Sequence, residues 1–199
     1  MKNVSDSFPN LLPFDGEAYL LQHFFTPAES DVFLEQLIHQ VAWKQEPIKM
    51  FGKLIMQPRL TAWYGDLDKT YRYSGITMTP LPWSDTLLIL KNKINAFAGT
   101  SFTSALLNYY RDGKDSMGWH RDNEKELGLN PVIASVTFGA ARNFQLRHYR
   151  DKKNLTNIML THGSLLLMHG ATQHYWEHQL PKTSKEIAAR INITFRVIL

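Results

Sequence analysis

The sequence predicts a mainly β protein in which two N-terminal helices pack outside an antiparallel sandwich or barrel. Two observations support this prediction. Helix signals are confined to the chain before Gly99, and short runs rich in β-branched and aromatic residues follow it, separated by Gly, Asn, Asp and Pro. Short strands at such spacing are typical of sandwiches and barrels. The 199 residues suffice for one domain with a sizeable core, and no repeat or linker divides them.

The first helix is expected to begin at Pro27 and to run to about residue 41. Thr26-Pro27-Ala28-Glu29 has the form of a capping box with proline at the first helical position. Apolar residues then recur at helical spacing. A second helix is expected over about 84–98, with Gly99 as its C-terminal stop. Neither helix carries recognisable chemistry, so both are interpreted as packing elements.

Six strands are expected after the second helix, and the last of them has a polar face. Its alternation admits two interpretations, a solvated face or the wall of a pocket. Two arginines in a pocket wall can hold a dicarboxylate, because the planar guanidinium matches carboxylate geometry bidentately. The polar face consists of Arg190, Asn192, Thr194 and Arg196. The six expected strands are 104–110, 132–138, 143–149, 157–161, 164–169 and 189–198.

His120 and Asp122 are the strongest metal-ligand candidates. Two residues apart on an extended chain, they project to the same face. One more histidine would complete a facial triad of two histidines and one carboxylate with open positions, which suits non-haem Fe(II) oxygenases. A metal triad beside a dicarboxylate clamp indicates an enzyme that uses 2-oxoglutarate. Spacing alone does not choose the third ligand among His162, His169, His174 and His178.

The composition is compatible with a nucleic-acid partner. The net charge is +4 and the pI is near 9.2. The absence of cysteine excludes disulfides and a thiolate metal site. We expect no signal peptide, no membrane association and an intracellular location, cytoplasmic or nuclear. The basic residues cluster on two segments, Lys44, Lys49, Lys53 and Arg59 on one and Arg142, Arg147, Arg150, Lys152 and Lys153 on the other.

Several motifs in this order resemble the AlkB family of Fe(II)- and 2-oxoglutarate-dependent dioxygenases. They are His120-Arg-Asp122, His178-Gln-Leu-Pro and Arg190-Ile-Asn192-Ile-Thr194-Phe-Arg196, supported by segments 107–113, 133–139 and 162–168. The resemblance covers about residues 45–199 and is closest to the branch that repairs methylated bases in duplex DNA. It implies one AlkB-like domain with a double-stranded β-helix, or jelly roll. About 1–98 would supply the helices and a nucleotide-recognition lid, and about 99–199 the catalytic core.

The resemblance also implies which residues bind iron and 2-oxoglutarate. His178 becomes the preferred third metal ligand beside His120 and Asp122, with His174 as runner-up. Arg190 is implied to hold the distal carboxylate, and Arg196 to lie near the end of 2-oxoglutarate that chelates the iron. The full set implied for 2-oxoglutarate is Asn108, Tyr110, Arg190, Asn192, Thr194 and Arg196.

The implied substrate is a base flipped out of DNA, because an N-methyl group inside a duplex cannot reach buried iron. Tyr73 would stack on the flipped base, where the branch has Phe, and Phe51 would fill the vacated space as a wedge. Asn123 and Glu124 follow the ligand Asp122, and the branch has Asp where Asn123 stands. The substrate contacts implied are Phe51, Gly52, Lys53, Tyr71, Tyr73, Asn123 and Glu124.

The sequence thus predicts a monomeric oxidative demethylase that requires Fe(II), 2-oxoglutarate and O2. Its expected substrates are 1-methyladenine and 3-methylcytosine in DNA, chiefly duplex, with hydroxylation of the methyl group and release of formaldehyde. No catalytic side chain beyond the metal ligands is expected. Three alternatives remain: the same chemistry on RNA or another methylated substrate, a nucleic-acid-binding relative without activity, and a cupin-like metalloprotein that does not use 2-oxoglutarate.

Overall fold

The computed structural model describes residues 4–50, 52–68, 71–73 and 76–199. The two expected helices are present as α2 (Pro27–Gln40) and α3 (Asp85–Ala98). Thr26 and Glu29 form both halves of the predicted capping box, and Gly99 ends α3 in the left-handed conformation with φ 64°. The described residues also include three short helical turns: α1 (Val4–Ser7), η1 (Lys125–Leu127) and α4 (Thr172–Tyr175).

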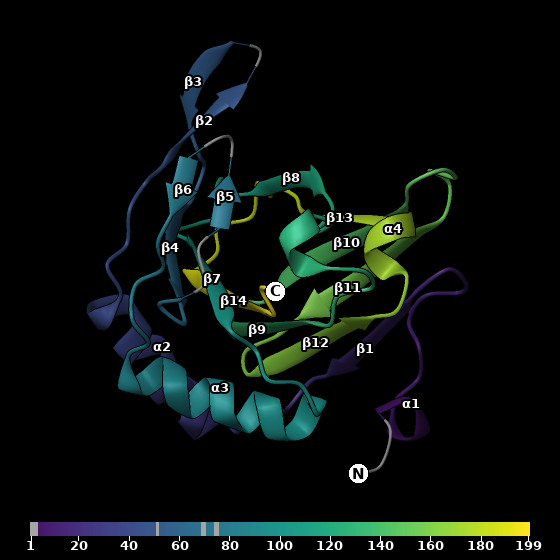
Figure 1. Cartoon of the computed structure of the whole chain (residues 1–199), viewed down its shortest axis with the longest axis horizontal. Helices are drawn as coiled ribbons and strands as arrows, with labels where there is room; N and C mark the ends of the chain where they lie inside the picture. Colours follow the sequence, from purple (N-terminus) through teal and green to yellow (C-terminus); the bar gives the residue numbers. More distant parts are fainter. Residues whose placement is uncertain (1–3, 51, 69–70, 74–75) are drawn as a thin grey trace.

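Ten strands form two antiparallel sheets that face each other across the interior, as Figure 1 shows. The larger sheet has the order β1-β12-β9-β14-β7-β4 and the smaller sheet the order β11-β10-β13-β8. The larger sheet contains β1 (Glu17–Leu21), β4 (Leu60–Gly65), β7 (Ser104–Tyr110), β9 (Ile133–Gly139), β12 (Ser164–His169) and β14 (Arg190–Arg196). The smaller sheet contains β8 (Met117–His120), β10 (Arg142–His148), β11 (Leu155–Leu160) and β13 (Trp176–Leu180). This is the jelly-roll class that the sequence predicted.

The outer face of the larger sheet is apolar and is covered by α2 and α3 (Figure 1). Phe25, Phe33 and Phe138 form a ring cluster in this layer, with centroids 5.4 to 5.7 Å apart. Burial of these side chains from water is what holds the helices against the sheet. Other buried members of the layer are Leu37, Leu87, Leu90, Ile94, Leu107, Val136, Leu165, Ile191, Ile193 and Phe195.

The space between the sheets is divided into an apolar half and a polar half. On the side of β1, β11 and β12, apolar side chains from the two sheets form a second buried cluster. On the side of β7, β8 and β14, the inner face instead carries the alternating polar residues of β7 and β14. The polar half is therefore where a ligand site can form. The apolar cluster includes Ile133, Leu146, Ile158, Leu160, Leu166 and Trp176.

Two hairpins stand apart from the sheets at one end of the molecule (Figure 1). They are β2 (Pro47–Met50) with β3 (Lys53–Met56), and β5 (Tyr71–Tyr73) with β6 (Ile76–Met78). Gly52 lies in the turn of the first hairpin with φ 78°, a conformation that glycine adopts without strain. Phe51, the expected wedge, lies outside the described residues.

Four strands of the two sheets were not predicted: β1, β4, β8 and β13. β8 and β13 have the sequences Met-Gly-Trp-His and Trp-Glu-His-Gln-Leu, which lack clean alternation because their inner faces carry polar site residues. The six predicted strands are all present: β7 and β12 have the predicted bounds, and the ends of the other four are displaced by at most two residues. Within the described ranges, no helix combines the length and apolar character needed to cross a bilayer.

Candidate metal and co-substrate site

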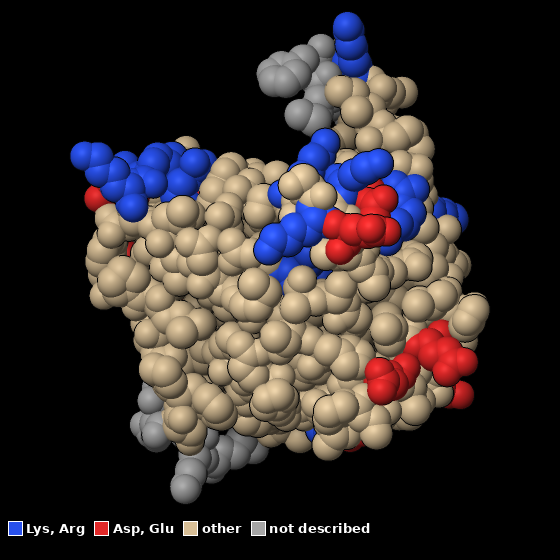
Figure 2. Space-filling model, turned by 180° about the vertical axis from the view of Figure 1, so that it is seen from behind, with Lys and Arg blue, Asp and Glu red and all other residues tan. Residues whose placement is uncertain are grey.

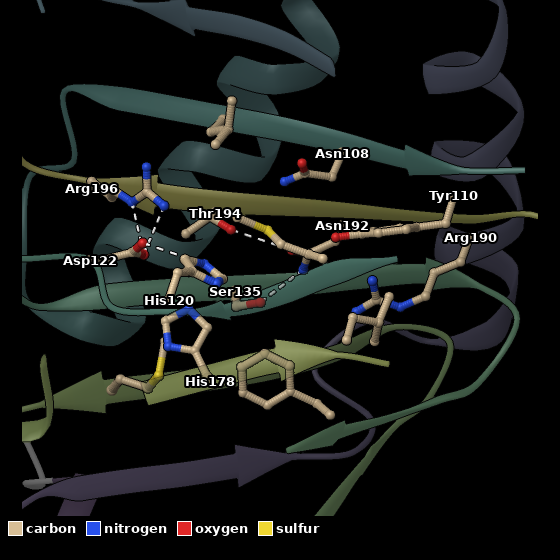
Figure 3. Close-up of a pocket in the computed structure, with 15 residues that line it drawn as sticks. Asn108, Tyr110, His120, Asp122, Ser135, His178, Arg190, Asn192, Thr194 and Arg196 are labelled. Atoms are coloured by element: carbon tan, nitrogen blue, oxygen red, sulfur yellow. Dashed lines mark hydrogen bonds and ion pairs between the residues drawn. The ribbon is translucent and has the colours of Figure 1, made fainter. Parts of the chain in front are cut away.

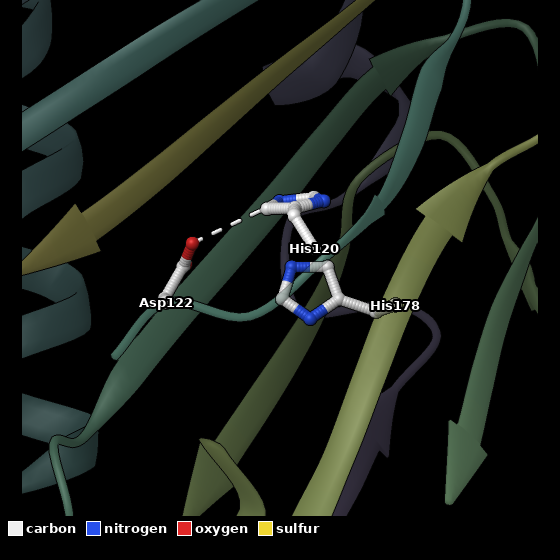
Figure 4. Close-up of side chains that lie close together, drawn as sticks. All are labelled: His120, Asp122 and His178. Atoms are coloured by element: carbon white, nitrogen blue, oxygen red, sulfur yellow. Dashed lines mark ion pairs between the residues drawn. The ribbon is translucent and has the colours of Figure 1, made fainter. Parts of the chain in front are cut away.

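His120, Asp122 and His178 converge in the polar half of the interior, as Figure 4 shows. One ligand atom from each of the three lies within 4.8 Å of the others. His120 Nε2 is 3.8 Å from Asp122 Oδ1, and the two imidazole centroids are 4.1 Å apart. In the described part of the chain, this is the one group of three or more metal-ligating side chains. It has the composition of a facial triad.

The two histidines are brought together by the pairing of β8 with β13. His178 is directly opposite His120 in this antiparallel register, so both side chains leave the same face of the smaller sheet. His120 Nδ1 is 2.9 Å from the carbonyl oxygen of Gly118. A proton on Nδ1 that donates to this oxygen leaves Nε2 unprotonated as a ligand, which is the usual arrangement of a metal-binding imidazole.

The charge states of Asp122 and His178 suit a divalent cation. Burial alone raises the pKa of Asp122, but the Arg196 guanidinium and the two imidazoles outweigh it and hold the pKa at about 2. Burial, reinforced by the neighbouring His120, lowers the pKa of His178 to about 3. At neutral pH the site therefore offers an ionised carboxylate and a neutral imidazole, the forms in which these groups bind metals.

Arg190 lies at the opposite end of the same pocket from Arg196 (Figure 3). Its side chain is buried beside Tyr110, with the guanidinium carbon 5.3 Å from the ring centroid. Nη2 donates to Thr137 Oγ1 at 2.9 Å, whereas Nε is buried without a protein acceptor among the described residues. Burial lowers the pKa of Arg190 to about 10, which still leaves it charged at neutral pH. A buried cation with an unused donor fits an anionic ligand.

Amide side chains on β7 and β14 form the wall between the two arginines. Asn108 Oδ1 accepts a hydrogen bond from Arg59 Nε at 2.7 Å, which leaves the Asn108 amide nitrogen as the donor toward the pocket. Asn192 uses its amide nitrogen on Ser135 Oγ at 2.8 Å and on the Val136 carbonyl at 2.9 Å. Asn108 is thus presented as a donor, while Asn192 is held by the sheet itself.

All nine residues predicted to bind metal or 2-oxoglutarate line this one pocket. The polar face of β14 is therefore a pocket wall and not a solvated surface. Among the alternative histidines, His162 instead contacts Asp31 and accepts from the Gly139 amide. The nine residues are Asn108, Tyr110, His120, Asp122, His178, Arg190, Asn192, Thr194 and Arg196.

Four of the residues predicted to contact the substrate have side chains that the structure describes, and none of these four lines the pocket. Gly52 and Lys53 are exposed on the hairpin of β2 and β3. Asn123 is exposed, and Glu124 is half-buried with its Oε2 atom unpaired among the described residues. The side chains of Tyr71 and Tyr73 on β5 lie outside the described part of the structure, as does Phe51.

Further residues that the sequence did not indicate line the pocket or support it from outside. Leu106 could have been found, because it precedes Asn108 and Tyr110 on the same strand face. No sequence pattern indicated Gln173. It is buried in the short helix α4, and its Oε1 accepts a hydrogen bond from the Asp122 backbone N–H at 2.9 Å. The unpredicted lining residues are Leu106, Met117, Ser135, Phe144, Met168 and Leu180.

Two arginines of the second basic segment are less exposed than the sequence suggested. Arg142 is buried and donates to the backbone carbonyls of Asp115 and Pro181. Arg147 contacts Glu177 on the smaller sheet, with Nη2 2.6 Å from Oε1. Lysine and arginine side chains nevertheless gather in the upper part of the rear face, with some acidic side chains among them (Figure 2). The surface below is mostly uncharged, apart from an acidic patch at its lower right. A polyanion would meet that upper region most favourably.

Comparison with known proteins agrees with the fold and the site. A family model described as the 2OG-Fe(II) oxygenase superfamily matches residues 17–196. With that match, the two facing sheets and the His-Asp-His group, the chain belongs to the AlkB family of 2-oxoglutarate- and Fe(II)-dependent oxygenases. A solved structure described as that of OsALKBH1 shares the fold, with a TM-score of 0.63, 19% identity, and coverage of 90% of this chain and 97% of that one.

The chain is similar in sequence to members of two branches of the family. Alpha-ketoglutarate-dependent dioxygenase alkB homolog 3 of Bos taurus is 47% identical over 179 residues, which is 85% of this chain and 62% of the relative. DNA oxidative demethylase ALKBH2 of Homo sapiens is 39% identical over 186 residues, which is 88% of this chain and 71% of the relative. The chain thus spans less than two thirds of the length of the bovine relative.

Proposed function

We propose that this protein is an Fe(II)- and 2-oxoglutarate-dependent dioxygenase that demethylates N-methylated bases in DNA. One observation carries the proposal: a group of three metal-ligating side chains and a buried arginine with an unused donor occupy the two ends of one pocket. The metal ligands are His120, Asp122 and His178. The name of the human relative, which describes a DNA oxidative demethylase, supports DNA as the substrate.

The residues of the pocket fit both Fe(II) and 2-oxoglutarate. A neutral imidazole and an ionised carboxylate at the triad match the donor set of Fe(II). At the far end, Arg190 would hold the distal carboxylate of 2-oxoglutarate through its unused Nε–H, with Tyr110 packed against it. Asn108, Asn192, Thr194 and Arg196 would line the chain of 2-oxoglutarate between that carboxylate and the metal.

Bound Fe(II), 2-oxoglutarate and O2 together supply the oxidation: the N-methyl group becomes N-hydroxymethyl and leaves as formaldehyde, while 2-oxoglutarate becomes succinate and CO2. The protein orients the reactants and excludes water. Arg196 holds Asp122 ionised, and burial keeps His178 neutral. No proton transfer from a protein side chain is required, so we assign no catalytic residue beyond the metal ligands.

We propose 1-methyladenine and 3-methylcytosine as the target bases, flipped out of a duplex. The hairpin of β2 and β3 stands off the body with a basic, exposed turn at Gly52 and Lys53. Such a hairpin suits insertion of Phe51 into the base stack. Tyr71, Tyr73, Asn123 and Glu124 are proposed to contact the flipped base. RNA is the alternative polymer, and the assay below separates the two.

The test is repair of a 1-methyladenine oligonucleotide by the full chain with Fe(II), with and without 2-oxoglutarate. We expect formaldehyde release and restored adenine that depend on 2-oxoglutarate. His120→Ala should abolish both, while His162→Ala, which alters a histidine in contact with Asp31, should not. Turnover that persists in metal-loaded His120→Ala would contradict the assignment of His120 as a metal ligand. Steady consumption of 2-oxoglutarate without repair would support the assignment of Fe(II) and 2-oxoglutarate and would reject 1-methyladenine in DNA as the substrate.

Comparison of substrates tests the duplex proposal. Phe51→Ala should slow repair of a duplex much more than repair of the same single strand, because a wedge is needed only where a base pair must be opened. Equal losses on the two substrates would reject the wedge. Faster repair of a matched methylated RNA than of either DNA would assign the chemistry to RNA.

A further inference from the structure

The backbone of Asp122 is held by a side chain from a distant part of the sequence. Asp122 follows the end of β8 and is 3% exposed, so its N–H cannot be satisfied by water. Gln173, which is 1% exposed, accepts this hydrogen bond through Oε1 at 2.9 Å. The contact joins the segment after β8 to the short helix α4.

The amide of Gln173 has one orientation open to it. Its Nε2 atom is 3.5 Å from Met168 Sδ, a weak acceptor that lines the pocket. A flipped amide would set two N–H donors against each other at Asp122 and lose the contact with sulfur. Gln173 is therefore fixed as an acceptor for Asp122, and it is rigid because both its amide atoms are engaged.

Asp122 is thus held from two sides. Arg196 on β14 donates to the carboxylate oxygen Oδ2 from Nε at 3.1 Å and from Nη2 at 2.7 Å. Gln173 holds the backbone N–H of the same residue. With Oδ2 engaged by Arg196, the other oxygen, Oδ1, faces His120 Nε2 across 3.8 Å. The two contacts together set where the ligand oxygen lies.

Helix α4, which contains Gln173, also connects the segments that carry two metal ligands, Asp122 and His178. Helix α4 leads directly into β13, the strand that carries His178 (Figure 1). On the neighbouring residue, the carbonyl of His174 accepts from Arg121 Nη1 at 2.9 Å, a second link between α4 and the segment of Asp122. The one segment that delivers His178 therefore also fixes Asp122.

We propose that Gln173 is a positioning residue of the metal centre, which sets the carboxylate ligand Asp122 relative to His178. The proposal rests on the function proposed above, in which these residues bind the metal. Partners that orient metal ligands typically contribute 10- to 100-fold to metal affinity. Loss of the Gln173 acceptor should reduce affinity within that range and should alter the geometry around the metal.

The experiment measures Mn(II) affinity of the full chain by electron paramagnetic resonance, without 2-oxoglutarate or DNA. Gln173→Leu removes the acceptor and should weaken Mn(II) binding about 10- to 100-fold. Gln179→Leu is the matched control: it is the same substitution on β13, at a side chain that donates to Gln145 outside the pocket. The absorption spectrum of Co(II)-loaded protein should change for Gln173→Leu and stay unchanged for Gln179→Leu.

Folding is checked by thermal unfolding of the apo-protein. If Gln173→Leu does not fold, Gln173→Asn takes its place, because it withdraws the acceptor by one methylene and keeps the polarity. Wild-type Mn(II) affinity in a folded Leu or Asn variant would overturn the proposal. Failure of the function itself is distinguishable: wild type and Gln179→Leu would then bind Mn(II) no better than His120→Ala.

Discussion

Arg196, which is half-buried, and the buried Asp122 form an ion pair in which two guanidinium nitrogens donate to one carboxylate oxygen. Nε and Nη2 lie 3.1 and 2.7 Å from Asp122 Oδ2. A bidentate pair would engage both oxygens, whereas this geometry leaves Oδ1 to the histidines. One arginine therefore keeps Asp122 charged and reserves one of its oxygens for a metal.

Arg196→Met should weaken metal binding by removing both functions. The pKa of Asp122 should rise from about 2, since Arg196 is the first of the groups that lower it. We expect Mn(II) affinity to fall 10- to 100-fold, as for other residues that orient metal ligands. The measurement is Mn(II) binding without 2-oxoglutarate. Arg147→Met, which breaks an arginine–glutamate pair outside the pocket, is the control and should bind normally.

Arg190→Met should weaken binding of 2-oxoglutarate and leave metal binding intact. Hydrogen bonds to charged groups contribute about 1.5–3 kcal/mol, which corresponds to roughly 10- to 100-fold in affinity. The comparison ligand is pyruvate, a 2-oxo acid that lacks the distal carboxylate. Titration of Mn(II)-loaded protein without O2 should show the loss for 2-oxoglutarate and no change for pyruvate. Equal losses for both ligands would contradict the assignment of Arg190 to the distal end.

The same substitution should not destabilise the apo-protein. Burial lowers the pKa of Arg190 to about 10, a sign that the charge is poorly solvated in the folded state. Replacement of a buried ionic group by an apolar one of similar volume is often neutral or stabilising. We expect Arg190→Met to unfold at or above the wild-type temperature. A large fall in that temperature would mean that Arg190 is chiefly structural.

The sequence predicted the walls of the site better than its supports. Alternation grouped the polar residues of the last strand, Arg190 among them, on one face, because a strand fixes the direction of every second side chain. The family resemblance then assigned this face and Asn108 to the pocket. Gln173 lies in an irregular turn, where no periodicity relates its direction to its neighbours. Its contact with Asp122 depends on how α4 packs in space. Only the folded chain could reveal it.

In the fold, too, elements with a local sequence signal were predicted, whereas elements that depend on long-range pairing were missed. The helix over 27–40 was predicted from its capping box, which is a local signal. β8 and β13 were missed because their sequence is set by the site: Gly118, His120 and His178 interrupt the apolar pattern of an ordinary strand. β8 forms by pairing with β13, and β13 also pairs with β10. These pairings join distant parts of the sequence, so local pattern does not reveal them. Short strands in which site residues interrupt the apolar pattern are thus hard to predict from local sequence.

Phe138→Ala should be among the more destabilising substitutions in the helix-covered layer. Phe138 is fully buried on β9 and contacts the rings of Phe25 and Phe33. Truncation of a buried phenylalanine costs about 3–5 kcal/mol, through lost burial and the cavity left behind. The urea midpoint should fall accordingly. Leu155→Ala, at a side chain that is 46% exposed, should change it little. A loss below about 1 kcal/mol for Phe138→Ala would contradict the packing described.

His178 should make the apo-protein less stable as the pH falls from 7 to 5. Its pKa is lowered from 6.5 to about 3 in the folded state, chiefly by burial. Between these values the unfolded chain binds a proton that the folded chain does not, so the free energy of unfolding falls as the pH falls. The slope from this one group is at most about 1.4 kcal/mol per pH unit. Asp122 does not contribute in this window, because its pKa is about 2 in the folded state and ordinarily 3.8, so it is ionised in both states.

The measurement is urea unfolding of metal-free protein at several pH values between 7 and 5. His178→Leu should flatten the slope, because the variant has no buried imidazole to keep neutral. Gln179→Leu, next to it on β13, should retain the wild-type slope. An identical slope in wild type and His178→Leu would show that the imidazole is already protonated, or solvated, in the folded apo-protein. His178 would then not be held ready for a metal, and the site would have to form on binding.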